Sequence, residues 1–535
     1  MFEQVPESTA WYHSWPVVLA ATVVFPPLGL VLLWTRRGTD MQLKVLGSLA
    51  VVLLCAGYAY ALLGPRRSAN TEGHYTELER HREAQRQQPP PPEVAQATAT
   101  AADPNAAAQA SPGADAAAGQ PPQPAAPGTE AAAASAPGQP AAPSSAAPPA
   151  RRNYWTNFRG PSRDGRYEEQ TLKTNWGAGG PAKLWSQPVG GGYASFSVAD
   201  GIAYTIEQRR GQETVAAYHV DTGRELWTHG WNAEYRDSTG DGPRATPTWD
   251  AGRVYALGAL GELRCLDAKT GKPVWSKNIL SDNGASNIQW AMAASPLIVD
   301  DKVVVMAGGR AGKSVVAYNK ATGARAWGAL GDEASYTSPM LVNLAGRRQI
   351  LVVTANQAAG IAPEDGAVLW SYPWRNSAGI NISQPIVAGP NRVFISAGYG
   401  KGAALFEVAS SGKAFNATTV WENVSMKNKF NSSVLHDGHV YGLDEGILSC
   451  VDVNTGERKW KGGRYGYGQV VLAGGHLIIT TEEGEVVLVR AAADKHTELA
   501  RFKALDGKTW NNPAIAGGRL LVRNAEQMAC FKLTD

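Results

Sequence analysis

The chain has 535 residues, of which 44% are hydrophobic and 18% are charged, and its formal net charge is +3 at pH 7. This small charge and the lack of a basic stripe in the sequence give no support to a nucleic-acid partner. The composition changes sharply along the chain, which predicts several parts of different physical character rather than one uniform domain.

The N-terminal part contains two long apolar stretches without charges, Trp15–Trp34 and Val45–Leu63. At about 1.5 Å rise per residue, each is long enough to cross a hydrocarbon core of about 30 Å. The residues before the first stretch include Glu3 and Glu7 but no Lys or Arg, which argues against a cleaved signal peptide. We therefore expect a transmembrane helical hairpin over residues 1–64.

The orientation of this hairpin follows from the basic residues beside it. Arg36, Arg37 and Lys44 lie between the two stretches. The positive-inside rule places such a loop in the cytoplasm and both termini outside, although Arg66 and Arg67 argue for the opposite orientation. We expect the C-terminal part of the chain to lie outside the cytoplasm.

Residues 65–151 are predicted to form a Pro/Ala-rich disordered linker, with one short charged helix near Tyr75–Gln88. Residues 89–150 are almost entirely Ala, Pro, Gln, Ser and Gly, with no aromatic residue. Such a segment buries too little apolar surface to offset the entropy of ordering. A coil of roughly 60 to 90 residues has an r.m.s. reach of about 50 Å, so we expect the anchored domain to work well away from the bilayer.

Residues 152–535 repeat one pattern, in which a Gly preceded by Thr or Asp is followed four positions later by a Trp. A repeat period in the forties with about four short strands per unit indicates a β-propeller. The copies are Gly223/Trp227, Gly271/Trp275, Gly323/Trp327, Gly366/Trp370 and Gly456/Trp460, with a weaker copy at Gly412 and Trp421.

Eight units of this repeat can be counted, and the last one, Pro513–Leu533, stops after three strands. The isolated strand Lys183–Trp185 lies ahead of the first unit. Because an open ring would leave a free sheet edge, we expect this strand to complete the last blade. The predicted fold is an all-β, eight-bladed β-propeller, with seven blades as the alternative. In the first blade the expected strands are Ser195–Ala199, Ile202–Glu207, Thr214–Val220 and Glu225–His229.

Three of the four cysteines occupy one equivalent position of the repeat. They are Cys265, Cys450 and Cys530, and other units place Ala217, Ala317 and Gly360 there. Equivalent positions in different blades are too far apart for a disulfide, so we interpret these cysteines as small buried side chains.

The repeat, best preserved over Leu266–Trp275, resembles the tryptophan-docking motif of the pyrroloquinoline-quinone (PQQ)-type repeat propellers, a quinoprotein alcohol dehydrogenase-like group. The segment Trp155–Gly165 is similar to that of BamB-like bacterial envelope proteins. The resemblance covers about residues 153 to 533. It implies two possible functions, because the group contains both quinoprotein dehydrogenases and the cofactor-free outer-membrane assembly factor BamB. It also implies a propeller in the periplasm, attached to the bacterial inner (cytoplasmic) membrane.

The resemblance to the dehydrogenases implies an adjacent Cys pair against the quinone, a Ca²⁺ ion held by carboxylate and amide oxygens, and an Asp base. The sequence has no adjacent Cys pair. Asp332, Glu333 and Asn381 are expected on loops that face the channel, but they do not map onto the family's ligand set. We therefore predict no catalytic residue, no metal site and no cofactor, with PQQ and Ca²⁺ as the alternative.

Two other motifs suggest sites that the sequence does not support. Gly308–Ser314 looks like a phosphate-binding loop but is one residue short and joins two predicted strands, so we interpret it as a hairpin. His436 and His439 flank an Asp-Gly turn, and without a third ligand in the sequence a surface hairpin is the better interpretation.

A bulky residue recurs two positions before each inner strand in seven of the eight units. These residues are Tyr193, Arg244, Tyr336, Ile382, Phe430, Tyr467 and Trp510. The remaining unit has Ala293 there, with Trp290 and Met292 close by. Such loops should face one mouth of the channel, where aromatic and cationic groups suit a peptide, a glycan or a flat cofactor. The alternative is that the rings wedge between blades. The predicted ligand-binding residues are Tyr193, Arg244, Trp290, Tyr336, Asn381, Lys429, Tyr467 and Trp510.

Together these observations predict a membrane-tethered, non-enzymatic binding scaffold for envelope proteins or peptides. The alternative is a membrane-bound, PQQ-dependent alcohol or sugar dehydrogenase that feeds the respiratory chain.

Overall fold

A computed structural model describes residues 17, 26–35, 40–63, 71–87, 154–177, 179–412 and 414–534. The chain divides into two units, one with residues 1–88 and 152–535 and one with residues 89–151. The prediction of a disordered linker at 89–151 falls outside the described residues. The expected short helix is present as α4 (Thr71–Gln87) and begins four residues earlier than predicted.

Two helices lie in the region of the expected transmembrane hairpin, α2 (Pro26–Thr35) and α3 (Met41–Leu63). Among the described residues, no helix is both long enough and apolar enough to cross a membrane. The ten residues of α2 give a length of about 15 Å, half of a hydrocarbon core. The predicted hairpin over residues 1–64 is therefore not supported, and residues 1–16, 18–25 and 36–39 of it lie outside the described part.

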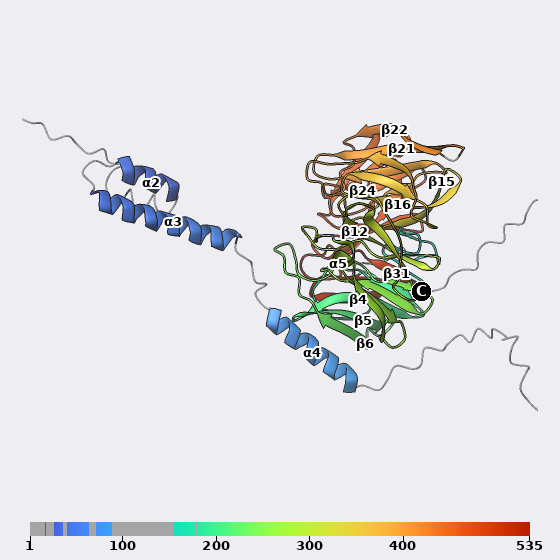
Figure 1. The fold of residues 1–535 in the computed structure, drawn as a ribbon. Coiled ribbons are helices and arrows are strands. Elements are labelled where there is room, and N and C mark those ends of the chain that lie inside the picture. The colour runs from blue at the N-terminus through green and yellow to red at the C-terminus, as the bar shows by residue number, and fades with distance from the viewer. Residues whose placement is uncertain are drawn as a thin grey trace, which may run out of the picture. The chain divides into compact units, whose positions relative to one another are not determined.

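The C-terminal part is a ring of eight sheets, so the eight-bladed propeller is confirmed and the seven-bladed alternative is wrong (Figure 1). Within each blade the strands are antiparallel and run from the central channel outward. The first four blades contain β3 (Ser197–Ala199), β4 (Ile202–Arg209), β5 (Gln212–His219) and β6 (Glu225–Asn232); β7 (Thr248–Asp250), β8 (Arg253–Leu257), β9 (Glu262–Asp267) and β10 (Pro273–Asn278); β11 (Leu297–Val299), β12 (Lys302–Gly309), β13 (Lys313–Asn319) and β14 (Arg325–Ala329); and β15 (Met340–Leu344), β16 (Arg347–Val353), β17 (Gln357–Ile361) and β18 (Val368–Pro373).

Blades five to eight follow the same plan, and a short helix, α5 (Ile279–Asn283), lies between blades two and three. They contain β19 (Ile386–Val387), β20 (Arg392–Ala397), β21 (Gly402–Ser411) and β22 (Ala414–Asn423); β23 (Val434–His436), β24 (His439–Asp444), β25 (Ile447–Asp452) and β26 (Arg458–Arg464); β27 (Gln469–Ala473), β28 (His476–Thr480), β29 (Glu485–Arg490) and β30 (Glu498–Lys503); and β31 (Ala514–Ala516), β32 (Arg519–Arg523), β33 (Gln527–Lys532) and β2 (Ala182–Pro188).

The strand pattern follows from burial on both faces of each blade. The two middle strands of a blade are continuous apolar runs that are almost completely buried, as in β12 and β28. The outermost strands alternate between exposed and half-buried residues, as in β6. Tight turns join neighbouring strands, and the turn between β3 and β4 places both Asp200 and Gly201 at positive φ.

The ring closes through β2, as predicted for the strand at Lys183–Trp185. This strand pairs antiparallel with β33, with Trp185 opposite Cys530. The first blade therefore meets a last blade that is built from both ends of the propeller sequence, and β3 contacts β31 across this seam. Every blade thus has four antiparallel strands, the seventh blade carries a fifth, parallel strand, β1 (Arg166–Tyr167), and no gap is left in the ring.

The repeated Trp residues tie each blade to the next one. In most blades the indole lies on the repeat Gly of the next blade, as Trp227 does on Gly271. Its Nε1 donates to the carbonyl oxygen three residues before that Gly; the distance from Trp227 Nε1 to Ala268 O is 3.0 Å. Trp370 is the exception, because its Nε1 donates to Gln349 within its own blade at 2.6 Å. The other pairs are Trp185 on Gly223, Trp275 on Gly323, Trp327 on Gly366 and Trp421 on Gly456.

The cysteine position of the repeat lies directly opposite the docking Trp. Cys265 pairs with Trp275, and Cys450 pairs with Trp460. All three propeller cysteines are free and buried, which confirms the interpretation made from the repeat. A small side chain is needed here because the large ring of the Trp occupies the same layer of the blade.

Candidate binding mouth

The predicted ring of bulky residues surrounds one end of the central channel, here called the mouth. It encloses a cavity of about 170 Å³. Five of the predicted binding residues line the cavity: Tyr193, Arg244, Trp290, Tyr336 and Trp510. Ile382, Phe430 and Ala293, which share the same repeat position, line it as well. The repeat position therefore located the mouth, while binding at these residues remains a prediction.

The aromatic rings of the mouth pack on one another in two groups. Tyr193 and Trp510 are stacked with their centroids 5.6 Å apart, and Phe430 lies 4.9 Å from Trp510 and 5.0 Å from Tyr467. On the other side, Trp290 and Tyr336 lie 5.9 Å apart. Because each ring is held by a neighbour, the mouth is a preformed surface rather than a set of independent side chains.

Three cations lie against these rings. The Arg244 guanidinium is 5.4 Å from the centroid of Tyr193, Lys508 Nζ is 4.3 Å from Trp510, and Lys429 Nζ is 5.0 Å from Tyr467. Burial lowers the pKa of Arg244 and of Lys508. The mouth therefore joins an apolar cavity to positive charges at its wall and rim.

Two predicted residues lie beside the cavity and one lies away from it. Tyr467 and Lys429 do not line the cavity and contact it through Phe430. Asn381 is buried, and its Nδ2 donates to the carbonyl oxygens of Thr354 (2.8 Å) and Ala355 (3.2 Å). The amide of Asn381 thus joins neighbouring loops, and Asn381 does not line the cavity; a binding role for it stays a prediction.

The mouth is floored by a segment that the sequence did not identify as part of it. Residues 154–167 fill the channel, and Phe158 from this segment lines the cavity. Trp155 forms a bridge with Val198 of β3, and β1 (Arg166–Tyr167) then pairs in parallel with β27. We call residues 154–167 the plug. The Trp155–Gly165 segment that resembles envelope proteins is therefore a structural insert of the channel.

Two arginines of the plug are completely buried and bond to the ends of the inner strands. Arg163 donates to the carbonyl oxygens of Ser295 and Pro339, both at 3.0 Å, and also contacts Pro296 O. Arg159 donates to Ser433 O at 2.9 Å. Burial lowers the pKa of Arg163 to about 9 and that of Arg159 to about 10, so both are positively charged at neutral pH. The acceptors of both guanidinium groups named here are backbone carbonyl oxygens near the start of the inner strands.

A series of hydrogen bonds links six of the eight blades at the level where the inner strands begin. In each step, the backbone N–H of one blade's opening residue donates to the side-chain oxygen of the next blade's opening residue. The steps are Ser195 to Thr246 (2.9 Å), Thr246 to Ser295 (2.9 Å), Ser295 to Ser338 (2.9 Å), Ser338 to Gln384 (2.6 Å) and Gln384 to Ser432 (3.0 Å). The polar residues at these opening positions therefore hold the six blades in register.

The oxygen atoms that line the mouth do not form a ligand set for PQQ with Ca²⁺. The plug fills the channel, and the oxygens that line the mouth are hydroxyl and amide groups such as Ser432, Gln469 and Asn512. A calcium ion needs several carboxylate or carbonyl oxygens around one point. Asp332 is already engaged, since it accepts from Asn356 and from Thr354. Within the described ranges, no three His, Cys, Asp or Glu side chains form a group suited to a metal ion.

A second, polar cleft of about 830 Å³ lies beside the mouth and shares Tyr336 with it. Asp332 and Glu333 line this cleft rather than the mouth. The two remaining motifs are hairpins, as predicted: Gly308–Ser314 lies at the β12–β13 turn, and His436 and His439 lie on either side of the β23–β24 turn.

Glu213 of β5 has a buried carboxyl group whose pKa is affected by the nearby Arg244. We expect this group to make the stability of the fold depend on pH. Its Oε1 accepts the Ala259 N–H at 2.7 Å, and burial raises its pKa from 4.5 to about 7. Because the folded protein retains a proton that the unfolded chain has lost, stability should fall as pH rises from about 4.5 to about 7 and then level off. Glu213→Gln should remove this decline and exceed the parent's stability by about 3 kcal/mol at pH 8, with no gain at pH 4.5.

Urea denaturation at both pH values checks this expectation, with the exposed Glu483→Gln as the control. An equal gain at both pH values would contradict the assigned role of Glu213.

Comparison with known proteins gives two kinds of relative. Residues 211–462 match the family model described as outer membrane protein assembly factor BamB. Outer membrane protein assembly factor BamB of Yersinia pestis is 22% identical over 326 residues, which cover 57% of this chain and 78% of the relative. Quinohemoprotein alcohol dehydrogenase ADH-IIG of Pseudomonas putida is 30% identical over 138 residues, which cover 24% of this chain and 18% of the relative.

Among solved structures, BamB from Moraxella catarrhalis aligns with a TM-score of 0.48 at 17% identity, covering 66% of this chain and 99% of that chain. The matched residues 211–462 lie within the propeller and include several of its Trp–Gly contacts. In sequence, the chain is therefore similar to BamB over most of that relative's length and to part of a quinohemoprotein alcohol dehydrogenase.

Proposed function

We propose that the propeller is a non-enzymatic binding module that holds a protein partner of the bacterial envelope at its mouth. The observation that carries this proposal is the mouth itself, a preformed aromatic cavity that is closed below by the plug. A closed cavity cannot pass a ligand through the channel. It can accept a side chain that is presented from outside.

The size of the cavity favours a peptide anchor over a small-molecule substrate. Pockets for small ligands typically enclose about 300–1,000 Å³, whereas the mouth encloses about 170 Å³. This volume suits one apolar side chain inserted between the rings of Tyr193, Trp510 and Tyr336. Aromatic cavities of this kind are common energetic centres of protein interfaces.

The charges around the cavity specify the chemistry of the partner further. Arg244 lines the cavity, and Lys508 and Lys429 lie against rings at its rim. An acidic residue or a carboxyl terminus next to the inserted side chain would meet these cations. The partner is therefore an exposed peptide segment with an apolar residue beside a negative charge. The similarity to an outer membrane protein assembly factor of Yersinia pestis supports an envelope protein as the source of this peptide.

Photo-crosslinking tests this function. A photoreactive amino acid at Ala293, which lines the mouth, should crosslink the full chain to an envelope protein in intact cells. Trp510→Ala should weaken binding of that partner about 30-fold or more, since loss of a central aromatic anchor commonly costs about 2 kcal/mol. Trp176→Ala is the matched control, because Trp176 packs against Phe502 outside the plug and does not line the mouth.

Two results would contradict the proposal. One is a crosslink that persists unchanged in Trp510→Ala. The other is dye reduction by an alcohol or a sugar after PQQ and Ca²⁺ are added to the purified chain, which would favour the dehydrogenase alternative.

The same proposal places the propeller in the periplasm, at the bacterial inner membrane. Its support is the similarity to an outer-membrane assembly factor. Protease added to spheroplasts should degrade the propeller if this location is right, and protection of the propeller until the cells are lysed would contradict it.

A further inference from the structure

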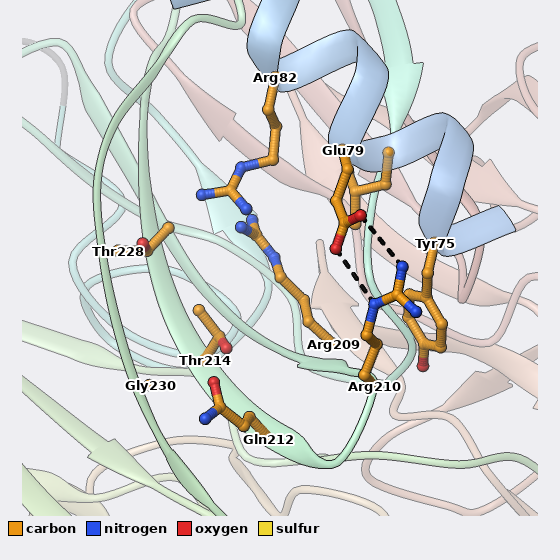
Figure 2. A pocket seen from close by; sticks show the side chains of 10 residues that line it. Tyr75, Glu79, Arg82, Arg209, Arg210, Gln212, Thr214, Thr228 and Gly230 are labelled. Carbon is orange, nitrogen blue, oxygen red and sulfur yellow. Dashed lines mark hydrogen bonds and ion pairs between the residues drawn. The ribbon is translucent and has the colours of Figure 1, made fainter. Parts of the chain in front are cut away.

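The helix α4 lies on the propeller at the seam where the ring closes. Only two of its described side chains are buried, Tyr75 and Leu78, with 7% and 3% of their surfaces exposed. Both line the cavity between α4 and the first blade, and Figure 2 shows Tyr75 there beside Arg210. The remaining surface of α4 is polar and charged.

Hydrogen bonds join α4 to the closing strand β2 and the residue that follows it. His74 Nε2 lies 2.8 Å from Val189 O. About two helical turns after His74, His81 Nε2 lies 3.0 Å from Gln187 Oε1. Gln85 Nε2, one turn further, lies 2.8 Å from the same oxygen. The contacts therefore extend along most of the helix rather than at one end.

Ion pairs join the same helix to the first blade. Arg210 forms a two-pronged pair with Glu79, with distances of 3.1 and 3.0 Å, and also contacts Glu72 (Figure 2). Arg82 bonds Glu225 of β6, with Nε 2.7 Å from Oε1. The side chains of Arg82 and Glu225 are only 19% and 11% exposed, so this pair is largely shielded from solvent.

The cavity between α4 and the first blade, about 400 Å³, belongs to this docking surface. Three arginines line it, Arg82, Arg209 and Arg210. Each of them is already paired with a glutamate, so the cavity has no surplus positive charge for an anion. Its character is that of a helix-docking groove rather than a ligand site.

Docking is what gives α4 a stable structure. A helix of 17 residues with a polar surface is marginal when isolated in water. The buried Tyr75 and Leu78 and the paired charges supply the missing stabilisation. An undocked α4 is therefore expected to lose its helical structure.

We propose that α4 is the point at which the N-terminal segment is attached to the propeller. In that case, the connection between α3, which ends at Leu63, and the propeller is the seven residues 64–70. Seven residues span at most about 25 Å, whereas a coil over residues 64–153 would reach about 50 Å. The docked helix thus shortens the tether and replaces the long reach expected from the linker.

The described residues on either side of positions 88–153 both contact the first blade. On the N-terminal side, Gln85 accepts the Glu225 N–H at 3.1 Å. On the C-terminal side, Tyr154 donates to Asp200 at 2.6 Å. If α4 is the attachment point, the length of residues 88–153 does not set the distance between the N-terminal helices and the propeller.

Hydrogen exchange on the full chain tests the docking. Amides of residues 71–87 should exchange at least 100-fold more slowly than an unfolded peptide. In Leu78→Asp the protection should fall at least tenfold, while the propeller peptides stay unchanged. Ala84→Asp is the matched control, since it adds the same charge at an exposed position of the same helix.

A charge swap gives a second, independent measurement. Arg210→Glu should lower protection of residues 71–87, and adding Glu72→Arg and Glu79→Arg to it should restore it. Loss of protection in the propeller itself would show that the variant had damaged the fold and would contradict the proposed role. Exchange of residues 71–87 at the unfolded rate in the parent chain would overturn the docking.

The tether length is measured with spin labels at Gln42→Cys and Lys269→Cys in a Cys55→Ser background; the other cysteines are buried. The parent and Ala84→Asp should give a short, narrow distance distribution, and Leu78→Asp a longer, broader one. An unchanged distribution in Leu78→Asp would overturn the proposal that α4 sets the tether length.

Discussion

Replacing Arg163 with alanine is expected to lower the free energy of unfolding by about 3 to 5 kcal/mol. The completely buried guanidinium donates to carbonyl oxygens of two blades, Ser295 O and Pro339 O, and to Thr248 Oγ1 at 3.2 Å. Deleting the side chain leaves these buried oxygens without donors and leaves a cavity in the channel. Chemical denaturation of the full chain, followed by the shift of the midpoint, measures the loss.

The control for this prediction is Arg236→Ala. Arg236 is paired with Glu234 on the surface, with 69% of its side chain exposed, and such pairs contribute little. We expect a change below about 0.5 kcal/mol for this variant. If Arg163→Ala lost as little as Arg236→Ala, the plug would not be part of the cooperative structure, and the floor of the mouth would have to be reconsidered.

A second large effect is expected for Gly271→Ala in the docking motif. Gly271 has a φ of +70°, and a methyl group added there would lie 2.4 Å from the ring of Trp227. The left-handed backbone costs an alanine about 1 to 2 kcal/mol, and the overlap with a packed ring adds about 1 to 3 kcal/mol. The expected total is about 2 to 5 kcal/mol of lost stability, measured by the same denaturation experiment.

Gly252→Ala separates these two contributions. Gly252 has a similar φ of +78°, but a methyl group there would meet no atom within 4 Å. This variant should therefore show only the backbone cost of about 1 to 2 kcal/mol. Equal losses in the two variants would mean that the Trp–Gly contact does not hold neighbouring blades together.

The architecture of the propeller could be predicted because the same sequence pattern recurs from blade to blade. Most of the eight units place the docking Trp, the small residue opposite it and the bulky residue at the mouth in equivalent positions. One weak copy also explains one irregularity. Gly412 has no ring against it, and the preceding Trp370 bonds within its own blade. The weak copy at Gly412 thus lacks the Trp–Gly contact that the stronger copies make.

The plug could not be predicted because it occurs once. Nothing in the neighbourhood of Arg163 indicates that its acceptors are backbone oxygens of residues 132 and 176 positions away. The partners of Asn381 could not be predicted for a related reason, since they are carbonyls of a neighbouring loop. A pattern of side chains identifies which residues share an environment, but backbone acceptors carry no sequence signal.

The docked helix had a signal that was available in the sequence. Tyr75 and Leu78 are spaced by three residues in an otherwise charged segment, so they lie on one face of a helix. Two apolar residues are too few to identify an amphipathic helix by periodicity. Most of the stabilising groups, such as Arg210 and Glu225, belong to the propeller.

The position of the plug in the chain has a consequence for the order of events during synthesis. Residues 154–188, which supply both the plug and the closing strand, leave the ribosome before any blade is complete. Their partners come much later: Arg159 bonds Val470 O, 311 residues downstream, and β2 pairs with β33 at the end of the chain. The closing strand β2 must therefore wait, unpaired, until translation ends, so factors that shield nascent chains should matter most for this strand.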